Sequence, residues 1–334
     1  MIAAEARPAR VLITGGSGFI GTNLVAAWRA RGAEVLNLDI APPRDPHHGP
    51  LWARLDIRER DALGRAIADF APDLVFHMAA RTDLEGRRLD DYAANVAGVA
   101  NLLAALAATP VPKAVFASTM LVCRYGRIPA GDDDYCPDTR YGESKAIGER
   151  LIREAGLDGH WLIVRPTSIW GPWFDAPYRG FFQAVAKGRY VHPGGADVTK
   201  ALGYVGNLVH ILDRLVAAPA ERTRARTFYI ADYPPVRLSQ WAEAVRRACE
   251  ARPIRTAPLW ALEAAAAAGD AAKALGWRAP PLTRFRLRNM TTASEFDMTE
   301  VAALAGPLPF DLDAGARETV AWMRTAGLLP ARER

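Results

Sequence analysis

The sequence predicts an α/β fold in which a doubly wound parallel sheet is covered by helices on both faces. Three observations support this prediction. Short runs of Val, Leu, Ile and Phe alternate with helical stretches along the first half of the chain, the runs are continuously apolar, and the first leads directly into a glycine-rich turn. Continuously apolar strands separated by helices are typical of a parallel sheet that is buried on both faces.

The expected elements follow one another in a regular order up to Arg165. Each strand is a short run of large apolar residues, and the first helix ends at Gly32. Strands are expected at 10–14, 35–39, a short run closed by Asp56, 74–79, 114–118 and 161–164, and helices at 20–31, 91–108 and 141–154.

The alternation breaks down after Arg165. Residues 166–197 are rich in Gly, Pro and aromatic residues, which favours loops and short helices around a pocket. The Ala-rich run 262–275 is expected to be an ordinary packed helix, although it could also bind a partner. The other expected elements of this half are helices at 207–217 and 238–251 and a strand at 227–231 that returns to the main sheet.

Two domains are expected, because 334 residues exceed the usual size of one compact core. We predict a larger domain at residues 8–165, to which residues 201–232 return. Residues 166–330 are expected to form a smaller, interleaved substrate-binding domain.

The charge pattern argues against a nucleic-acid partner. The formal net charge of +5 is mild for this length, the Arg residues are spread along the chain, and no basic run has interleaved aromatic residues. A diffuse positive field still suits a small anionic ligand, such as a dinucleotide.

The cysteines indicate a reduced protein without a metal centre. Cys123, Cys136 and Cys249 are few, odd in number and far apart, and no Cys/His cluster has metal-ligand spacing. We therefore predict free thiols, no metal site and a cytoplasmic location. Residues 1–10 lack the apolar stretch of a signal peptide, and we find no apolar run of the roughly 18 residues that a membrane helix requires, so no membrane partner is expected.

The glycine turn after the first strand predicts a dinucleotide site. In the sequence Thr14-Gly-Gly-Ser-Gly-Phe-Ile-Gly21, Gly16, Gly18 and Gly21 match GxGxxG, while Gly15, Gly18 and Gly21 match the wider GxxGxxG. Either register leaves out side chains where the backbone turns sharply and a pyrophosphate approaches the free N–H groups of a helix N-terminus. A tight turn without a ligand is the alternative.

Asp39 strengthens the prediction and favours NAD. It ends the second strand, 18 residues after Gly21, where a carboxylate can accept hydrogen bonds from the adenosine ribose. The same carboxylate would repel the 2′-phosphate of NADP, and the nearest Arg, Arg44, lies beyond two prolines. Together these residues predict a Rossmann-type, NAD-binding domain.

Tyr141 and Lys145 are the predicted catalytic pair. In Tyr141-Gly-Glu-Ser-Lys145 a phenol and an ammonium stand at i and i+4 on one helix face. An ammonium nearby favours the phenolate and lowers the pKa of the phenol, which could then exchange a proton with a substrate hydroxyl while hydride passes to nicotinamide. An exposed Tyr/Lys pair is the alternative.

These features together resemble a known enzyme family. The chain is similar to the extended short-chain dehydrogenase/reductases, and within them to the NAD-dependent epimerase/dehydratase branch. The residues that carry the resemblance are Gly15, Gly18, Gly21, Asp39, His77-Met-Ala-Ala80, Asn95, Ser118-Thr119, Tyr141 and Lys145.

The resemblance implies roles for further residues. Asp56 would meet the adenine, Thr119 would bond the reacting oxygen beside Tyr141, and Lys145 would also hold the nicotinamide ribose. Asn95 could instead cap a helix, His77 could be a core histidine, and Ser118-Thr119 could simply end a strand. The implied cofactor-binding set is Gly15, Gly18, Phe19, Ile20, Gly21, Asp39, Asp56, Ile57, Ala79, Ala80, Asn95, Ser118, Tyr141, Lys145 and Pro166. The family likeness further suggests a homodimer formed through the helices at 91–108 and 141–154.

Two departures from the family pattern bear on the reaction. Dehydratases carry an acidic pair after the catalytic Thr, whereas Thr119 is followed by Met120-Leu121, so dehydration lacks its proton carriers. After Val122 the family usually has Tyr-Gly, but here Cys123-Arg124 comes first, so the local loop must differ.

The predicted substrate contacts are Thr119, Ser168, Lys200 and Arg284. Ser168 replaces an Asn of nucleotide-sugar epimerases and weakens the expected diphosphate contact. Lys200 falls near a family Arg that meets phosphate. Arg284, with Arg286 and Arg288, could supply another phosphate contact or could be one solvated strand face.

Three functions remain open at this point. The favoured one is a nucleotide-sugar epimerase in which NAD is recycled. The second is a net alcohol dehydrogenase for a bulkier, sterol-like or lipid substrate, and the third is an NAD-binding protein without chemistry, against which the intact Thr/Tyr/Lys set argues. Aromatic residues of the second half could line an apolar pocket, stack on a sugar or pack the small domain: Trp170, Trp173, Phe174, Phe181 and Phe182.

Overall fold

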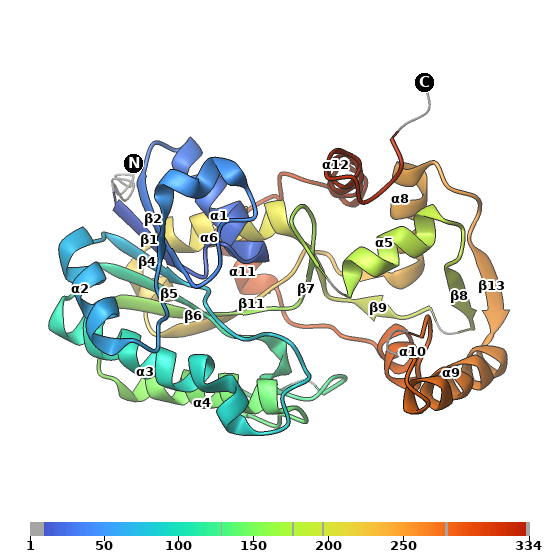
Figure 1. Cartoon of the computed structure of the whole chain (residues 1–334), viewed down its shortest axis with the longest axis horizontal. Helices are drawn as coiled ribbons and strands as arrows, with labels where there is room; N and C mark the ends of the chain where they lie inside the picture. Colours follow the sequence, from blue (N-terminus) through green and yellow to red (C-terminus); the bar gives the residue numbers. More distant parts are fainter. Residues whose placement is uncertain (1–9, 128, 176, 196, 278–279, 332–334) are drawn as a thin grey trace.

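A seven-stranded, fully parallel sheet forms the centre of the computed structural model, as the sequence predicts (Figure 1). The structure describes residues 10–331 except 128, 176, 196 and 278–279. The sheet has the order β11-β6-β5-β4-β1-β2-β3. Its strands are β1 (Arg10–Thr14), β2 (Glu34–Asp39), β3 (Trp52–Arg54), β4 (Leu74–His77), β5 (Lys113–Ala117), β6 (His160–Pro166) and β11 (Arg226–Ile230).

Helices cover both faces of this sheet because its strands are apolar on both sides. In β1, Val11 and Ile13 join one core cluster while Leu12 joins the other. One face is covered by α1 (Phe19–Ala30), α6 (Val205–Ala217) and α11 (Thr299–Ala305). The other is covered by α2 (Arg60–Phe70), α3 (Ala93–Ala108) and α4 (Arg140–Glu154).

The strand order reverses between β1 and β4, and this reversal positions the site. At such a switch point the connections after neighbouring strands leave in opposite directions and open a crevice at the carboxyl ends. The glycine turn follows β1, and the segment from Met78 follows β4, on the two sides of that crevice. The carboxyl ends of β5 and β6 lie next along the same edge.

A second lobe, at the right of Figure 1, contains most of the chain after β6. Its core continues that of the sheet through Trp170, Phe174, Phe182 and Trp241. The remaining helices of the chain are α5 (Tyr178–Ala186), α7 (Ala220–Thr223), α8 (Leu238–Cys249), α9 (Leu259–Ala274), α10 (Arg284–Thr291) and α12 (Leu312–Thr325). The short strands pair as β7 (Ser168–Trp170) with β10 (Leu202–Tyr204), β8 (Val191–Gly194) with β13 (Arg255–Pro258), and β9 (Thr199–Lys200) with β12 (Val236–Arg237).

The sequence located the strands of the main sheet and the helices α1, α3, α4, α6, α8 and α9 to within a few residues, but it did not predict α5, α7, α10, α11 or α12. The strand expected to return to the main sheet is β11, which pairs with β6. The prediction missed α2, and β3 ends two residues before Asp56. The alternative of a strand at Arg284–Arg288 is wrong, because these residues form α10. The proposed domain boundaries stay predictions, and their start at residue 8 lies outside the described residues.

The helical run Leu89–Ala108 meets the length and composition of a membrane-crossing helix, with 20 residues and a mean hydropathy of 1.2. The sequence prediction found no such run. In the structure Leu102, Leu103 and Leu106 of this run are buried against the sheet and its neighbouring helices. A helix that packs into a protein core satisfies the same criteria, so the run is explained by the fold.

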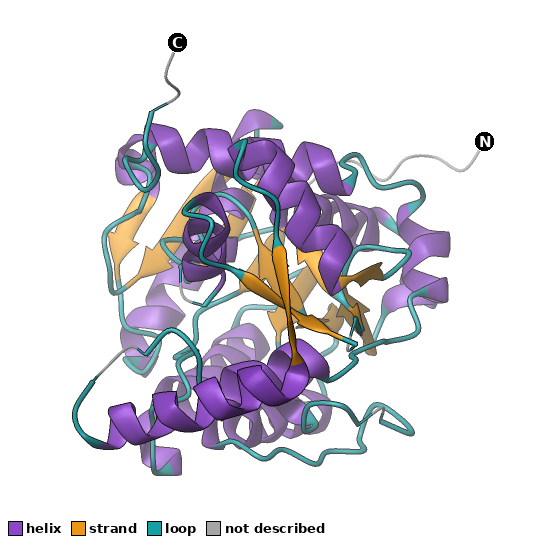
Figure 2. Cartoon of the chain, turned by 90° about the vertical axis from the view of Figure 1, so that its right-hand side faces the viewer, coloured by secondary structure: helices purple, strands orange, loops and turns teal. Residues whose placement is uncertain are grey.

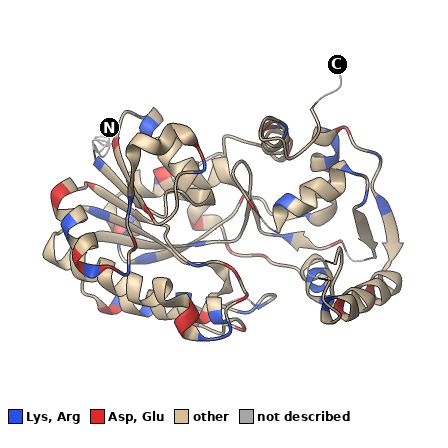
Figure 3. Cartoon of the chain, in the orientation of Figure 1, with Lys and Arg blue, Asp and Glu red and all other residues tan. Residues whose placement is uncertain are grey.

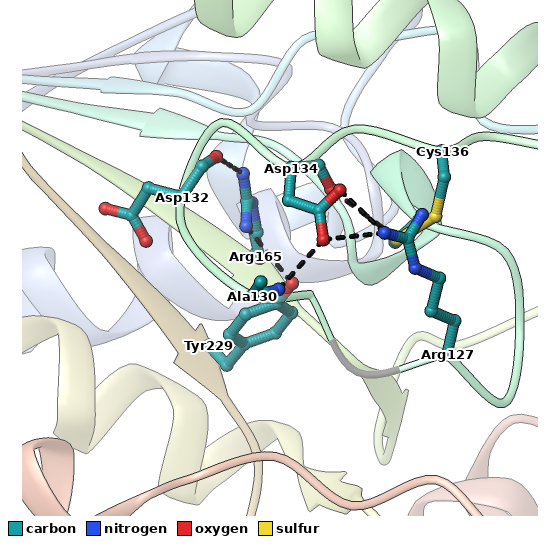
Figure 4. Close-up of a disulfide and its surroundings, with 8 residues drawn as sticks. Arg127, Ala130, Asp132, Asp134, Cys136, Arg165 and Tyr229 are labelled. Carbon is teal, nitrogen blue, oxygen red and sulfur yellow. Dashed lines mark hydrogen bonds and ion pairs between the residues drawn. A yellow bond between two sulfur atoms is a disulfide. The ribbon is translucent and has the colours of Figure 1, made fainter.

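Cys123 and Cys136 form a disulfide, and the expectation of three free thiols is wrong for this structure (Figure 4). The two residues are 13 apart in sequence and meet because their backbones pair in a parallel bridge. Spacing along the chain could not reveal this, because the intervening loop folds back on itself. Cys249 stays a free, partly buried thiol.

We expect the denatured, unreduced protein to expose one reactive thiol, from Cys249, and the reduced protein to expose three. Thiol titration in denaturant with and without reductant measures both numbers. The variant Cys136→Ser should expose two thiols before reduction. Three thiols in the unreduced wild-type protein would contradict the disulfide.

Candidate active site

The glycine turn after β1 lies in close contact with the backbone segment after β4. Gly15 has φ +74°, and a Cβ on it would lie 2.5 Å from the backbone nitrogen of Ala79, so the turn after β1 lies directly against the segment after β4. A Cβ on Gly21 would overlap the carbonyl oxygen of Gly15. Gly18 caps α1 without any side-chain hydrogen bond, which leaves the first N–H groups of the helix free for an anion.

Asp39 lies beside this turn, as the sequence predicts. Its carboxylate accepts hydrogen bonds from the backbone N–H of Ser17 at 3.0 Å and of Ala41 at 3.0 Å. The glycine turn and the end of β2 are thus joined through one carboxylate. Arg44, the nearest cation after Asp39 in the sequence, donates to the carbonyl oxygen of Trp173, which favours an unphosphorylated ribose.

Thr119, Tyr141 and Lys145 come together at the carboxyl end of β5. Thr139 caps α4 by accepting from the N–H of Gly142 at 3.0 Å. Gly142 has no side chain where α4 contacts the carbonyl oxygen of Leu121, so the helix can approach the segment after Thr119. The Tyr141 and Thr119 hydroxyls lie close to each other, and Lys145 Nζ donates to the Ala117 carbonyl oxygen at 2.6 Å.

The pKa of Tyr141 moves in the direction opposite to the prediction. Burial raises it to about 12, although the hydrogen bond with Thr119 lowers it. Burial also lowers the pKa of Lys145 to about 8, against the negative charge of Glu149. The structure does not show the expected activation of the phenol by the ammonium, because Lys145 is directed to Ala117 and desolvation of the phenol dominates.

The chain matches a known family. The model of the NAD-dependent epimerase/dehydratase family matches residues 11–231. The chain belongs to this family of extended short-chain dehydrogenase/reductases. It is an enzyme of the NAD-dependent epimerase or dehydrogenase type, and its cofactor is NAD.

Relatives of this family member differ in their substrates. A 3β-hydroxysteroid dehydrogenase/Δ5→4-isomerase from Mycobacterium tuberculosis is 33% identical over 73% of this chain and 70% of its own length. A 4-epimerase for N-acetylglucosaminyl-diphospho-undecaprenol from Escherichia coli O157:H7 is 26% identical over 93% of this chain and 94% of its own. The crystal structure of UDP-glucose 4-epimerase from Thermotoga maritima matches the fold with a TM-score of 0.74 at 20% identity, covering 95% of this chain and 99% of that one.

The residues of this family member fit NAD at the predicted place. Ser118 Oγ is buried and has no hydrogen-bond partner among the described residues, which leaves it available to a ligand. Pro166 ends β6 at the same edge of the sheet. The glycine turn and Asp39 would hold the adenosine and pyrophosphate, while Ser118, Tyr141 and Lys145 would hold the nicotinamide end.

Asn95 and His77 support the cofactor site indirectly. The Asn95 side chain bonds the N–H and the carbonyl of Arg81 and the hydroxyl of Ser144, so it fixes the segment after β4. Its predicted cofactor contact is not supported, since both amide hydrogens are used. His77 is a core histidine: it pairs with Thr14 at 2.8 Å, and burial lowers its pKa to about 3.

Three further predicted cofactor residues lie at the edges of the site. Asp56 is engaged by Arg58, with its two oxygens 3.0 and 2.6 Å from the guanidinium, and this ion pair lowers the pKa of the carboxyl. Ile57 is buried against Gly98 of α3. Phe19 packs near Phe174 at the start of α1.

Glu149 is a positioning residue that the sequence analysis did not identify. Its spacing of one helical turn from Lys145 is the signal that could have indicated it. Its carboxylate accepts hydrogen bonds from Arg165 Nε at 2.9 Å and from Nη2 at 2.7 Å, and both side chains are 1% exposed. Arg165 also donates to the Tyr229 hydroxyl and the Asp132 carbonyl (Figure 4). One guanidinium thereby joins α4, β6, β11 and the disulfide loop.

The predicted substrate contacts are mostly engaged with other groups. Ser168 is buried beside the hydroxyl of Tyr178, a neighbour that the sequence analysis did not single out. Lys200 Nζ donates to the carbonyls of Asn289 and Thr292 and to the Tyr125 hydroxyl, and the side chain is buried. Arg284 is exposed at the start of α10.

The aromatic residues of the second half pack the lobe core. Trp170, Phe174 and Phe182 are at most 2% exposed and lie against one another. Phe181 stacks on Trp241 with centroids 4.2 Å apart. Of the three open interpretations, core packing is therefore the one that the structure supports for these residues.

We expect Gly21→Ala to abolish NAD binding, because the added methyl group would overlap backbone of the turn. Gly64→Ala is the matched control: no atom lies within 4 Å of a Cβ at this helical position. The control should bind NAD normally, and its free energy of unfolding should be up to about 1 kcal/mol higher than that of the wild type. Isothermal titration with NAD and urea unfolding measure both effects, and unchanged affinity of Gly21→Ala would contradict the assigned turn.

We expect Glu149→Ala to lower the free energy of unfolding by about 3–5 kcal/mol, because it leaves the Arg165 guanidinium buried without its counter-charge. The double variant Glu149→Leu/Arg165→Met removes both charges and should recover most of this loss. Urea unfolding of the wild type and these variants measures it. A double variant as unstable as the sum of the single changes would be evidence against the pair.

Proposed function

We propose that this enzyme is a net NAD-dependent dehydrogenase for a secondary hydroxyl group on a bulky, largely apolar, sterol-like alcohol. The observation that carries this proposal is the position of Lys200. It is the cation expected to meet a substrate phosphate, but its ammonium is enclosed by two backbone carbonyls and a tyrosine hydroxyl. A buried ammonium with these partners has little remaining capacity to bind a diphosphate.

The other groups on the substrate side point the same way. Tyr178 lies beside Ser168, and Tyr125 lies over the Lys200 ammonium. Neutral hydroxyls and aromatic rings suit an uncharged substrate that carries few polar groups. The sequence favoured a nucleotide sugar although Ser168 weakened the expected diphosphate contact, and of the two cations considered for phosphate, Lys200 and Arg284, Lys200 has other partners.

The relatives give independent support. The M. tuberculosis relative named for a 3β-hydroxysteroid is 33% identical over the 261 aligned residues, against 26% over 322 residues for the undecaprenol-linked sugar epimerase. The names of both relatives describe substrates with large apolar portions. The epimerase nonetheless matches 93% of this chain, including the second lobe, so sugar epimerisation is the second candidate.

The chemistry follows from the three clustered side chains. NAD, when bound, accepts a hydride from the carbon that carries the hydroxyl group. The Tyr141 hydroxyl exchanges a proton with the substrate oxygen, and Thr119, close to Tyr141, holds that oxygen in place. Lys145, one helical turn from Tyr141, donates to the Ala117 carbonyl and would hold the nicotinamide ribose. Dehydration is not included, because Met120 and Leu121 provide no acid or base.

We expect the purified protein to form NADH in proportion to a 3β-hydroxysteroid and to leave UDP-glucose and UDP-N-acetylglucosamine without inversion at C4. NADH absorbance follows the first reaction and sugar analysis the second. Tyr141→Phe should lower turnover by roughly 10²–10⁴-fold while NAD affinity is kept. Sugar inversion without net NADH would overturn the dehydrogenase proposal in favour of the second candidate.

A further inference from the structure

Exposed large apolar side chains gather at one end of the second lobe. In the described part of the chain six such residues are exposed, and four of them belong to α9, α10 and the turn between them. These four are Trp260, Leu275, Trp277 and Phe285, with exposed fractions of 73%, 90%, 56% and 59%. Large exposed apolar groups that lie together mark an interaction surface more often than single ones do.

The exposed face of α9 is a continuous apolar stripe. Trp260, Ala264, Ala268, Ala271 and Leu275 follow at intervals of four, four, three and four residues, which places them on one helix face, and all five are exposed. The expectation of an ordinary packed helix is therefore only half fulfilled. The opposite face packs, since a Cβ on the buried Gly269 would overlap the Leu282 carbonyl oxygen.

The same segment holds the whole net charge of the protein. Residues 252–292 contain seven Lys or Arg and two Asp or Glu, a net charge of +5, and the entire chain with 42 basic and 37 acidic residues also has +5. The rest of the chain is neutral. On α10, Arg284, Arg286 and Arg288 are exposed, and none of them has an ion pair with a carboxylate among the described residues. Figure 3 shows the basic residues of α10 beside α9.

We propose that α9 and α10 form a docking surface for a bilayer that contains anionic phospholipids. The apolar stripe with Trp260, together with Trp277, would enter the interfacial region, where indole rings partition well, and the arginines would meet the headgroups. Figure 2 looks onto this end of the molecule, where α9 runs across the lower front. This proposal departs from the expectation of no membrane partner. That expectation came from the sequence, which does not show that Trp260 and Trp277 are exposed in the tertiary structure.

The charge argues against a second copy of this chain as the occupant. In a two-fold symmetric dimer the same patch would face itself, so the exposed Arg284, Arg286 and Arg288 of the two copies would be brought together. An anionic surface avoids this repulsion between like charges and attracts the basic residues of the patch. The proposal does not depend on which alcohol the enzyme oxidises.

The docking surface is connected to the substrate side of the active site. The carbonyls of Asn289 and Thr292, at the end of α10, hold Lys200, and Lys200 holds Tyr125 of the disulfide loop. A bilayer bound at α9 and α10 would therefore lie next to the wall of the site rather than behind the sheet.

The test is co-sedimentation of the full chain with vesicles of phosphatidylcholine, with and without phosphatidylglycerol. We expect binding to the anionic vesicles that declines as salt is raised. The variant Trp260→Ser/Trp277→Ser/Phe285→Ser should bind about tenfold more weakly. The matched control Ile40→Ser/Leu84→Ser changes the two exposed apolar residues that lie elsewhere and should bind as the wild type does.

NAD-dependent thermal stabilisation of each variant verifies that it is folded. Absence of wild-type binding to anionic vesicles at low salt would overturn the proposal, as would undiminished binding of the triple variant. Light scattering adds a further outcome: if the wild type fails to bind vesicles and forms a dimer that the triple variant loses, a second copy covers this surface and the proposal is wrong.

Discussion

The buried ion pair between Arg165 and Glu149 is the interaction on which the geometry of the active site depends. Both side chains are 1% exposed, so each charge requires the other. Glu149 stands one turn beyond Lys145 and two beyond Tyr141 on α4, and Arg165 stands at the end of β6 beside Pro166. The pair therefore fixes the catalytic helix relative to the strand end where the nicotinamide is expected. Backbone of the disulfide loop completes the contacts of the guanidinium.

Burial gives the catalytic groups their protonation states, and the ion pair makes that burial possible. Without a nearby ligand, burial keeps the Tyr141 phenol protonated, with a pKa of about 12, and brings the pKa of Lys145 down to about 8. The negative charge of Glu149 opposes the shift at Lys145 and helps to retain its proton. Additional positive charge near the phenol would lower its pKa, and the phenol could then exchange a proton with the substrate.

The fold and the local motifs could be predicted because each depends on short-range order. The strand β1, the glycine turn and the Tyr141/Lys145 spacing all arise from neighbours within a few residues of one another. The errors concern partners that only the tertiary structure selects. Asn95 reaches Arg81, Lys200 reaches the carbonyls after α10, and Cys123 reaches Cys136 across a folded loop. A side chain's type indicates what it can bond, but its nearest partner is set by packing.

The extra Cys123-Arg124 and the enclosed position of Lys200 belong to one structural change on the substrate side. The extra Cys123-Arg124 places Tyr125 after a disulfide-bonded bridge, where its ring lies over the Lys200 ammonium with the centroid 4.9 Å from Nζ. The same ammonium fixes the end of α10 through two carbonyls. A cation that the resemblance assigned to a phosphate thus serves to join the loop to α10. The Lys200 ammonium therefore bonds protein groups in the place where the resemblance implied a phosphate contact.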